Sequence, residues 1–510
     1  MSLRKRIIMN AGSNWASMFV LAVVGLVLIR IIYREVGPKA YGIWALLATG
    51  LRYPMILERA FVLAINRLAA FYRSDIKQVN RFVSASFIIM AGLAVLTVIA
   101  ATLLSYVVPN MFSAITDEFA RDARITCILV GITLAIKMLE ATFSGALQGY
   151  QYYTRYNIVI IISNLLRAVL TIGLLVVWKN IIAFQSALSI TALTSAVLMY
   201  LTARKSIAGL SIDIRLINKN SLQELWQYTS HSIARSGSSI FMFSTMALLV
   251  GLVGTAANVA VYDIAQRIPS FVRSLLAATQ VVFLPAVSEL WAKGRVEAIK
   301  AVIKKGTRIS SVLACAIVIL LLIFTNKILL LWLTDVPSEL TAVMQVLMIS
   351  FLSGGLFEIW LPALVGMGHL RGLTVASIIS ALIAVLLALG LMLRGPVSVP
   401  MAPAVTLAVV LWVKTGIWLP LYGLRKLGIR PYEYLKESLS QPLIASFISI
   451  IVIWVLHRFL LSGIVHWSAM LALDTVIVTA VFTAISLRKE TGDLIVAVRK
   501  KFKIKQEQQI

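Results

Sequence analysis

The chain has 510 residues, of which 60% are apolar and only 13% are charged, and its mean hydropathy is +0.92. Soluble globular proteins contain about 45–50% apolar and about 25% charged residues, so this composition excludes a water-soluble enzyme and also a disordered chain. Lys and Arg exceed Asp and Glu by 47 to 21, a net charge of +26. In a membrane protein, basic cytoplasmic loops explain such an excess, and nucleic acid is not needed as a partner.

Fourteen apolar runs are long enough to cross a bilayer, because a spanning helix needs about 20 mostly apolar residues. In chain order they are residues 15–36, 41–65, 82–108, 123–147, 157–178, 181–201, 231–253, 257–285, 309–333, 340–365, 373–393, 402–424, 441–461 and 467–487. The two longest polar segments, 203–229 and 286–308, are basic and amphipathic and are expected to lie along the membrane surface. We therefore predict an all-α polytopic membrane protein of about 14 transmembrane helices.

Loop charges predict the orientation of these spans. The loops on the side of the two termini carry 30 Lys and Arg, whereas the opposite loops together with the adjoining ends of the spans carry 8. This bias places both termini in the cytoplasm. The basic tail, residues 488–510, suits the anionic inner leaflet.

An internal repeat follows from matches at a single offset of 217 residues. The matched segments are Val36-Gly37 with Val253-Gly254, Ala146-Leu147-Gln148-Gly149 with Ala363-Leu364-Val365-Gly366, and Gly173-Leu174 with Gly390-Leu391. Because each copy contains six spans, the repeats are parallel, and such transporters carry substrate between their halves. The predicted domains are an N-terminal six-helix lobe (1–205), a C-terminal six-helix lobe (206–430), helices 13 and 14 (431–487) and the cytoplasmic tail (488–510).

Arginines near the middle of the membrane are the residues least explained by packing. Arg52 and Arg267 each precede a proline by two residues, at nearly equivalent points of spans 2 and 8, and Arg273 follows. Facing lipid, these three side chains would together cost roughly 10 kcal/mol. They are expected to face a wet cavity, counter-ions or a ligand. Pro54 and Pro269 each remove a backbone hydrogen bond beside the arginine, and a broken helix is tolerated at that depth mainly where it lines a cavity.

Other basic residues extend this predicted cationic set. Arg59 is seven residues from Arg52 and would share its helix face, and Arg167 lies in the middle of span 5. Arg30 and Arg235 lie nearer an interface and could equally snorkel towards water. Surplus guanidinium groups suit a pyrophosphate, which accepts bidentate hydrogen bonds, and they would repel organic cations.

Buried acids are the candidates for coupling to H⁺ or Na⁺. Glu58 and Glu358 are preferred, because neither has a basic residue at helical spacing on its own span. Asp263 is placed to pair with Arg267, and Glu140 to pair with Lys137, so both acids also have a purely structural interpretation. A fifth acid, Asp474, lies outside the repeated core.

The segments that carry a family resemblance lie along spans 1 to 12. They are Asn10-Ala11-Gly12-Ser13-Asn14, Gly37-Pro38-Lys39-Ala40-Tyr41-Gly42-Ile43-Trp44, Leu147-Gln148-Gly149-Tyr150-Gln151, and Val261-Tyr262 through Arg267 to Leu284-Pro285-Ala286-Val287-Ser288. With them the chain resembles the polysaccharide-type (O-antigen and oligosaccharide repeat-unit) flippases of the multidrug/oligosaccharidyl-lipid/polysaccharide exporter superfamily. That family typically has an acidic residue in the inner part of span 2, which corresponds here to Glu58.

The resemblance implies a two-lobed flippase of alternating access in a bacterial inner membrane. Its expected substrate is an undecaprenyl-pyrophosphate-linked oligosaccharide, moved outward with membrane lipids around it and a polysaccharide polymerase complex as a further partner. A peptidoglycan-precursor flippase and a multidrug/proton antiporter remain open within the same fold. A membrane-bound glycosyl polymerase would need a large outer loop, whereas every outer loop here is under about 20 residues.

Catalytic signatures are not found in the sequence. There is no glycine-rich phosphate loop with lysine, and the four histidines lack metal-ligand spacing. Cys127 and Cys315 fall inside apolar runs and are expected to pack as free thiols. No enzyme activity, cofactor or metal is predicted.

Overall fold

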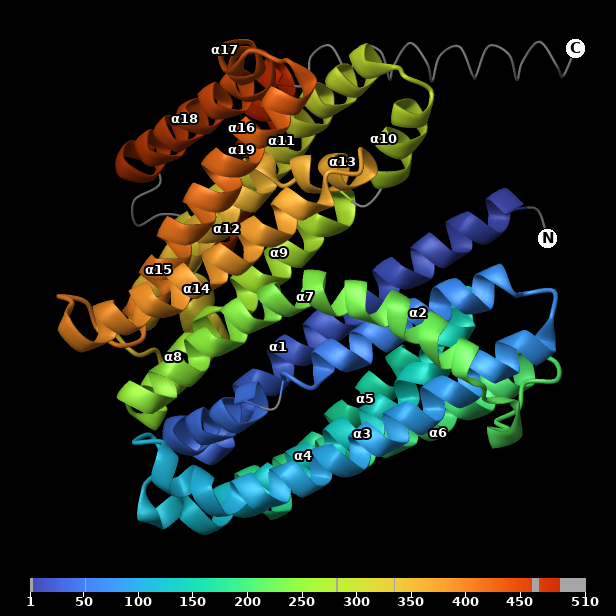
Figure 1. Ribbon diagram of the computed structural model, residues 1–510. Coiled ribbons are helices and arrows are strands. Elements are labelled where there is room, and N and C mark those ends of the chain that lie inside the picture. The colour runs from blue at the N-terminus through green and yellow to red at the C-terminus, as the bar shows by residue number, and fades with distance from the viewer. Residues whose placement is uncertain (1–2, 51, 281–282, 334, 461–466, 487–510) are drawn as a thin grey trace, which may run out of the picture. The chain divides into compact units, whose positions relative to one another are not determined.

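The computed structural model describes residues 3–50, 52–280, 283–333, 335–460 and 467–486 (Figure 1). Across these residues every regular element is helical. Twelve helices of the described part are long and apolar enough to cross a membrane, and residues 237–253 form a shorter apolar segment. The predicted all-α polytopic fold is confirmed.

The chain divides into two compact units. Unit 1 comprises Met1–Ile264 with Ala381–Pro403, and unit 2 comprises Ala265–Ser380 with Ala404–Ile510. Helix α14 (Leu370–Arg394) contributes residues to both units.

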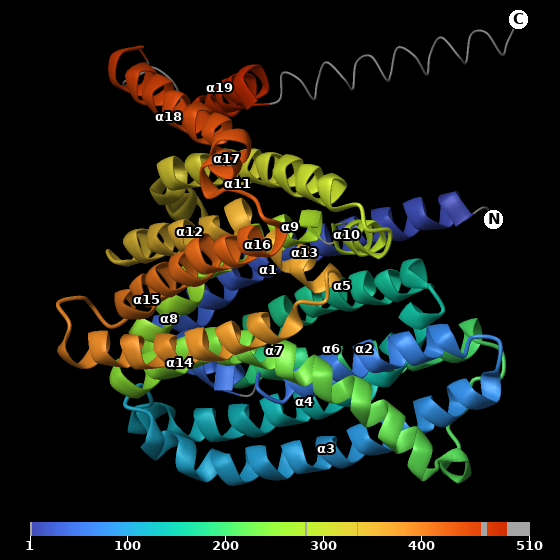
Figure 2. The same cartoon turned by 45° about the horizontal axis from the view of Figure 1, so that its top comes forward.

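Apart from its share of α14, unit 1 is built from eight α-helices and two short 3-10 helices, η1 and η2. They are α1 (Leu3–Gly50), α2 (Met55–Phe71), α3 (Ile76–Met111), η1 (Asp117–Phe119), α4 (Ala120–Gly149), α5 (Tyr153–Val177), α6 (Ile181–Ser206), η2 (Ile214–Leu216), α7 (Lys219–Val253) and α8 (Ala256–Ala265). Helix α4 packs between α3 and α6 and also contacts α2, while α5 packs on α1 and α6 (Figure 2). A continuous apolar core joins these helices, with Phe61, Val83 and Leu147 among its most buried members.

Two interruptions divide the first two predicted spans. Helix α1 bends at Gly37, whose φ of 79° lies in the left-handed region that only glycine adopts readily, and Pro38 follows. This bend separates predicted spans 1 and 2. The second interruption lies within span 2, where α1 ends at Gly50 and α2 begins at Met55 with Pro54 as its N-cap residue. Pro54 therefore accompanies a complete helix break.

Capping residues set several other helix starts. The Asp75 carboxylate accepts hydrogen bonds from the backbone of Lys77 and Gln78 at the start of α3. Asn218 and Ser221 form a capping box at the start of α7. From there α7 runs unbroken to Val253, so the later part of segment 203–229 begins a long helix and does not form a separate surface helix.

Unit 2 contains the remaining elements. They are α9 (Arg267–Gln280), α10 (Phe283–Ala292), α11 (Val296–Trp332), α12 (Leu340–Phe357), α13 (Trp360–Gly366), α15 (Met401–Leu411), η3 (Trp412–Trp418), α16 (Leu419–Leu427), α17 (Pro431–Tyr434), η4 (Leu435–Leu439), α18 (Ser440–Val455), η5 (Leu456–Leu460) and α19 (Trp467–Ser486). The segment predicted as surface helix at 286–308 is divided between α10 and the start of α11.

The last two helices belong to the core of unit 2. Helices α18 and α19 lie side by side and both pack on α11 (Figure 2). Ala445 and Ile453 of α18 and Phe482 of α19 are buried in the same cluster as Trp360. Large apolar side chains point outward elsewhere, as Leu386 of α14 does with 69% of its surface exposed. Such faces suit contact with lipid tails.

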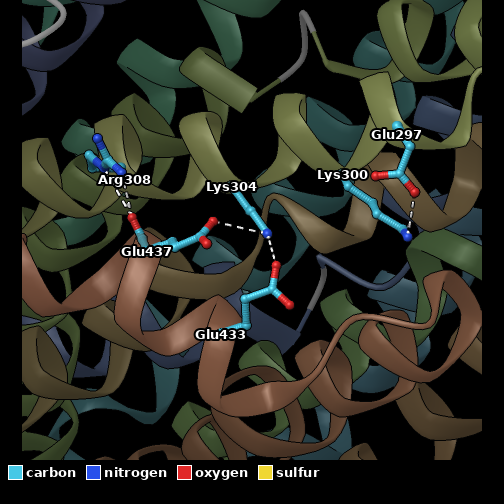
Figure 3. A network of polar contacts seen from close by, with 6 residues as sticks. All are labelled: Glu297, Lys300, Lys304, Arg308, Glu433 and Glu437. Carbon is cyan, nitrogen blue, oxygen red and sulfur yellow. Dashed lines mark hydrogen bonds and ion pairs between the residues drawn. The ribbon is translucent and has the colours of Figure 1, made fainter.

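An ionic network also ties the C-terminal segment to α11 (Figure 3). Lys304 forms ion pairs with Glu433 of α17 and with Glu437 of η4, the latter at 2.9 Å. One turn further along α11, the Arg308 Nε donates to the backbone carbonyl of Glu437 at 3.2 Å. These bonds fix the start of the α17–α18 segment on α11.

Candidate substrate and ion sites

Arg52 lies in the break between α1 and α2. Its backbone NH donates to Thr49 at 3.0 Å, and its carbonyl accepts from Met55 at 3.1 Å, so a tight turn connects the two helices. The side chain is half-buried and takes part in polar interactions. Next to it, the Tyr53 hydroxyl lies 2.8 Å from Thr245 of α7. The broken helix predicted beside this arginine is confirmed.

Arg59 does not share a helix with Arg52. We predicted a common face from their spacing, but α2 begins only at Met55, and Arg52 stands before it in the turn. Arg59 is exposed on the first turns of α2. The prediction of a single cationic face on span 2 is therefore wrong, because the break near Pro54 interrupts the helical register.

A buried polar cluster lies behind the first turn of α2. The Glu140 carboxylate on α4 forms an ion pair with Lys137 at 2.8 Å, and its other oxygen accepts a hydrogen bond from Ser195 of α6 at 2.8 Å. The carboxyl of Glu58 lies within electrostatic range of Lys137 and Glu140. Tyr156 of α5 lies in the electrostatic range of both acids. Four helices thus bring two carboxyls and one ammonium group together.

Glu58 and Glu140 differ in how their oxygens are satisfied. Both Glu140 oxygens have a partner, whereas the buried Glu58 Oε2 has no hydrogen-bond partner among the described residues. A buried carboxylate oxygen without a partner is costly, so binding of a proton or a cation there would be favourable. Glu58 is accordingly the member of the cluster best placed to exchange an ion.

Asp263 and Arg267 stand on either side of a second helix break. Helix α8 ends at Ala265 and α9 begins at Arg267, the counterpart of the break beside Arg52. Asp263 is fully buried and accepts a 2.6 Å hydrogen bond from the Tyr41 hydroxyl. The four-residue spacing predicts that Arg267 can pair with Asp263, but it gives no sign of Tyr41, which lies 222 residues earlier in the chain.

Arg273 has an aromatic partner within unit 2. Its guanidinium lies 5.3 Å from the ring centroid of Phe351 on α12, a distance typical of a cation–π interaction. Both Arg267 and Arg273 are half-buried.

Glu358 lies in unit 2, between α12 and α13. It is eight residues before Gly366, and Glu140 is nine residues before Gly149, so the two acids stand at similar places in the predicted repeats. Lys414 of η3 lies within electrostatic range of Glu358. Glu58 and Glu358 have no basic residue three or four positions away on their own helices, but each has a lysine nearby that comes from another helix.

The remaining predicted residues are dispersed. Arg30 is exposed on α1, which fits an interfacial side chain, and Arg167 is half-buried on α5. The side chain of Arg235 lies outside the described part of the structure. Asp474 is buried on α19, with one oxygen 2.9 Å from Nε2 of His457 in η5. No group of three or more His, Cys, Asp or Glu side chains suited to a metal ion occurs among the described residues.

The fold matches solved transporter structures. No protein-family model and no curated protein sequence matches the chain. The lipid II flippase MurJ in an inward closed conformation aligns with a TM-score of 0.69 and 16% identity, over 96% of this chain and 100% of that chain. An inward-facing multidrug resistance transporter of the MATE family aligns with a TM-score of 0.65 and 15% identity, over 81% of this chain and 94% of that one. A MOP-superfamily transporter from Pyrococcus furiosus aligns with a TM-score of 0.62 and 15% identity, over 83% and 96%. The chain therefore has the fold of the MOP-superfamily transporters.

Proposed function

We propose that the protein is an alternating-access flippase that moves a lipid-linked oligosaccharide from the inner to the outer leaflet of a bacterial inner membrane. Its substrate would carry an undecaprenyl pyrophosphate, as in the precursors of polysaccharides and O-antigen. The similarity to transporter structures supports membrane transport by this fold. The half-buried arginines Arg52, Arg267 and Arg273 support an anionic lipid as the cargo.

The observation that carries the proposal is the extent of the match to the lipid II flippase. That match covers 96% of this chain and so leaves only about 20 residues unaligned, fewer than the segment from Pro431 to Ser486 contains. It must therefore include part of the C-terminal helices α18 and α19. The MATE transporter aligns over only 81% of this chain, so the unaligned part is long enough to contain all of the C-terminal helices. The helices beyond the repeated core thus favour a lipid flippase over a drug transporter.

Arg52, Arg267 and Arg273 are the proposed ligands of the pyrophosphate. Arg52 and Arg267 occupy helix breaks at corresponding points of the two predicted repeats, and the Arg273 guanidinium lies over the Phe351 ring. Guanidinium groups form bidentate hydrogen bonds with phosphate oxygens, and they remain charged at any physiological pH. Three half-buried guanidinium groups would disfavour an organic cation as substrate.

Glu58, Glu140 and Glu358 are the proposed ion-coupling residues. Each lies close to a lysine, so uptake of a proton or Na⁺ by the carboxyl would change the local balance of charge. In a membrane interior such a change biases the packing of the helices involved. An inward ion gradient could in this way drive one direction of the cycle.

A peptidoglycan-precursor flippase is the second candidate function. The same structural match supports it, because lipid II is the substrate that the matched protein's name gives. Both substrates are polyprenyl pyrophosphates, so the two functions differ in the sugars and not in the anionic group.

A flipping assay with purified protein in liposomes tests the proposal. The liposomes would contain either an undecaprenyl-pyrophosphate oligosaccharide or lipid II, and a parallel set would carry a fluorescent organic cation. Transport of the oligosaccharide lipid supports the proposal, and faster transport of lipid II favours the second candidate. Efflux of the cation with neither lipid moved would contradict both.

A further inference from the structure

One end of unit 1 gathers the loops that the charge distribution assigns to the outside of the membrane. Ser113, after α3, donates hydrogen bonds to the carbonyl oxygens of Leu252 at 3.1 Å and Gly254 at 2.9 Å, at the end of α7. A side chain added at Gly254 would meet Val399 of the loop after α14 at 2.8 Å. This end of unit 1 is closely packed.

A buried hydrogen bond lies just inside these loops. The Tyr41 hydroxyl donates to Asp263 Oδ2 at 2.6 Å, and both side chains are at most 1% exposed. The Tyr41 ring is flanked by Tyr33 and Trp44, with ring centroids 5.9 and 5.8 Å away. Trp44 is itself held by a 2.9 Å hydrogen bond from its indole to Gln185. The orientation of the phenol is therefore fixed by its surroundings.

The two helices that carry this bond touch through their backbones. A β-carbon added at Gly42, next to Tyr41, would lie 1.8 Å from the carbonyl oxygen of Ala256, the first residue of α8. One turn further along α1, Leu46 lies 2.4 Å from the position of a β-carbon at Gly251 of α7, so α1 is also closely packed on α7. Only glycine permits so close an approach, so any larger residue would force α1 and α8 apart.

From this geometry we propose that Tyr41, Gly42 and Asp263 form an outer latch that holds α8 against α1 and parts whenever the protein opens to the outside. Tyr41 lies in the first predicted six-span repeat and Asp263 in the second, and both belong to unit 1. In a transporter that moves its two repeats relative to each other, their bond would join the moving segments. The inference rests on the proposed transport cycle and on the predicted orientation of the spans. It assigns a positioning role to Tyr41 and Gly42, neither of which contacts substrate in the proposed mechanism.

Thiol labelling from outside the cell measures the opening of the latch directly. Ala260 lies one turn before Asp263 on α8 and is 1% exposed, so an Ala260→Cys reporter is inaccessible while the latch is closed. The background carries Ala in place of Cys127 and Cys315, both buried. Glu118→Cys, at an exposed position in the short helix η1 on the same predicted side, reports the rate of unhindered labelling by a membrane-impermeant maleimide.

Removing the hydroxyl should increase labelling of the reporter. Tyr41→Phe keeps the ring and deletes the donor, and we expect Ala260→Cys to be labelled about tenfold faster, which corresponds to about 1.4 kcal/mol in the opening equilibrium. The matched control is Tyr434→Phe in unit 2, because Tyr434 is also buried and its hydroxyl also bonds to neighbours, Thr307 and Trp360. That variant should leave the labelling rate unchanged. Gly42→Ala should also speed labelling of Ala260→Cys, because the added methyl group would push α1 and α8 apart.

Asp263 variants separate the latch from ion coupling. Asp263→Asn keeps an oxygen that accepts the Tyr41 bond, so labelling should stay slow, whereas Asp263→Ala should speed it as Tyr41→Phe does. The latch is refuted if labelling rates are equal in the Tyr41→Phe and Tyr434→Phe proteins, or if the unmodified background already labels Ala260→Cys as fast as Glu118→Cys. Because labelling needs no substrate, a failed flipping assay would leave this result standing.

Discussion

The ammonium group of Lys137 lies 2.8 Å from the carboxylate of Glu140, one turn further along α4. Ser195 donates to the second oxygen of the same carboxylate from α6. Glu140 is 4% exposed, so its charge depends on these two partners for stabilisation. The pair was predicted from its spacing, and the structure adds its surroundings, with Glu58 beside it.

Removing Lys137 should destabilise the protein. Lys137→Met leaves Ser195 as the only partner of the buried Glu140 carboxylate. Because an unsatisfied charged group is costly, the free energy of unfolding should fall by about 1–3 kcal/mol. Thermal unfolding in detergent would show a lower midpoint. Adding Glu140→Gln should recover part of the loss, because the neutral amide no longer needs the ammonium group. An unchanged midpoint in the single variant would show that solvent already screens the pair.

Charge removal at Glu58 and Glu358 should weaken ion coupling. Glu58→Gln and Glu358→Gln keep the shape of the side chain but can no longer gain or lose a proton. We expect transport in liposomes with an imposed H⁺ or Na⁺ gradient to depend less on the size of that gradient. Glu297→Gln, at an exposed position on α11, is the control. Full transport with normal gradient dependence in both variants would remove these acids from the mechanism.

The arginines at the helix breaks should be needed for flipping. Arg52→Ala and Arg267→Ala each remove charge-assisted hydrogen bonds of about 1.5–3 kcal/mol, so substrate affinity should fall by about tenfold or more. Lys substitutions should retain partial function, since the charge remains while the planar fork is lost. Complementation of a flippase-deficient strain measures the effect, with membrane levels of each variant checked. Normal complementation by both Ala variants would mean that these arginines are structural.

The ionic network on α11 should hold the C-terminal helices in place. Lys304→Ala removes two ion pairs to α17 and η4, whereas Lys300→Ala removes only the pair with Glu297 inside α11 (Figure 3). Because Glu433 and Glu437 are about half exposed, Lys304→Ala should lower the free energy of unfolding by less than about 1 kcal/mol. We expect faster limited proteolysis between α16 and α18 for Lys304→Ala alone. Equal proteolysis of the two variants would contradict an anchoring role.

Reporter fusions test the predicted orientation. Fusions after Lys179 and within residues 253–257 should behave as external, and a fusion after Arg204 as cytoplasmic, because Lys and Arg concentrate on the predicted cytoplasmic side. Activity of an external reporter after Arg204 would overturn the orientation and with it the assignment of the latch to the outer face.

Composition and local pattern by themselves determined the fold class of this protein and the approximate positions of its membrane spans. Apolar runs of about 20 residues leave few structures other than membrane helices, because backbone groups in lipid must bond within their own segment. The helix breaks beside Arg52 and Arg267 were also visible in the sequence, since each lies near a proline. The observed helix ends differ from the predicted span ends because glycine and capping residues set them. Helix α7, for example, begins at Lys219 after the N-cap residue Asn218, whereas the predicted span begins at residue 231.

Only the tertiary structure decided which side chains meet. Each of the following contacts joins two different helices: the lysines near Glu58 and Glu358, the hydrogen bond from Ser195 to Glu140, and the hydrogen bond from Tyr41 to Asp263. Helical periodicity identifies which residues share a face of one helix, but it contains no information about which other helix packs on that face. That choice depends on the close approach of backbones, as between Gly42 and Ala256, and therefore on the fold as a whole.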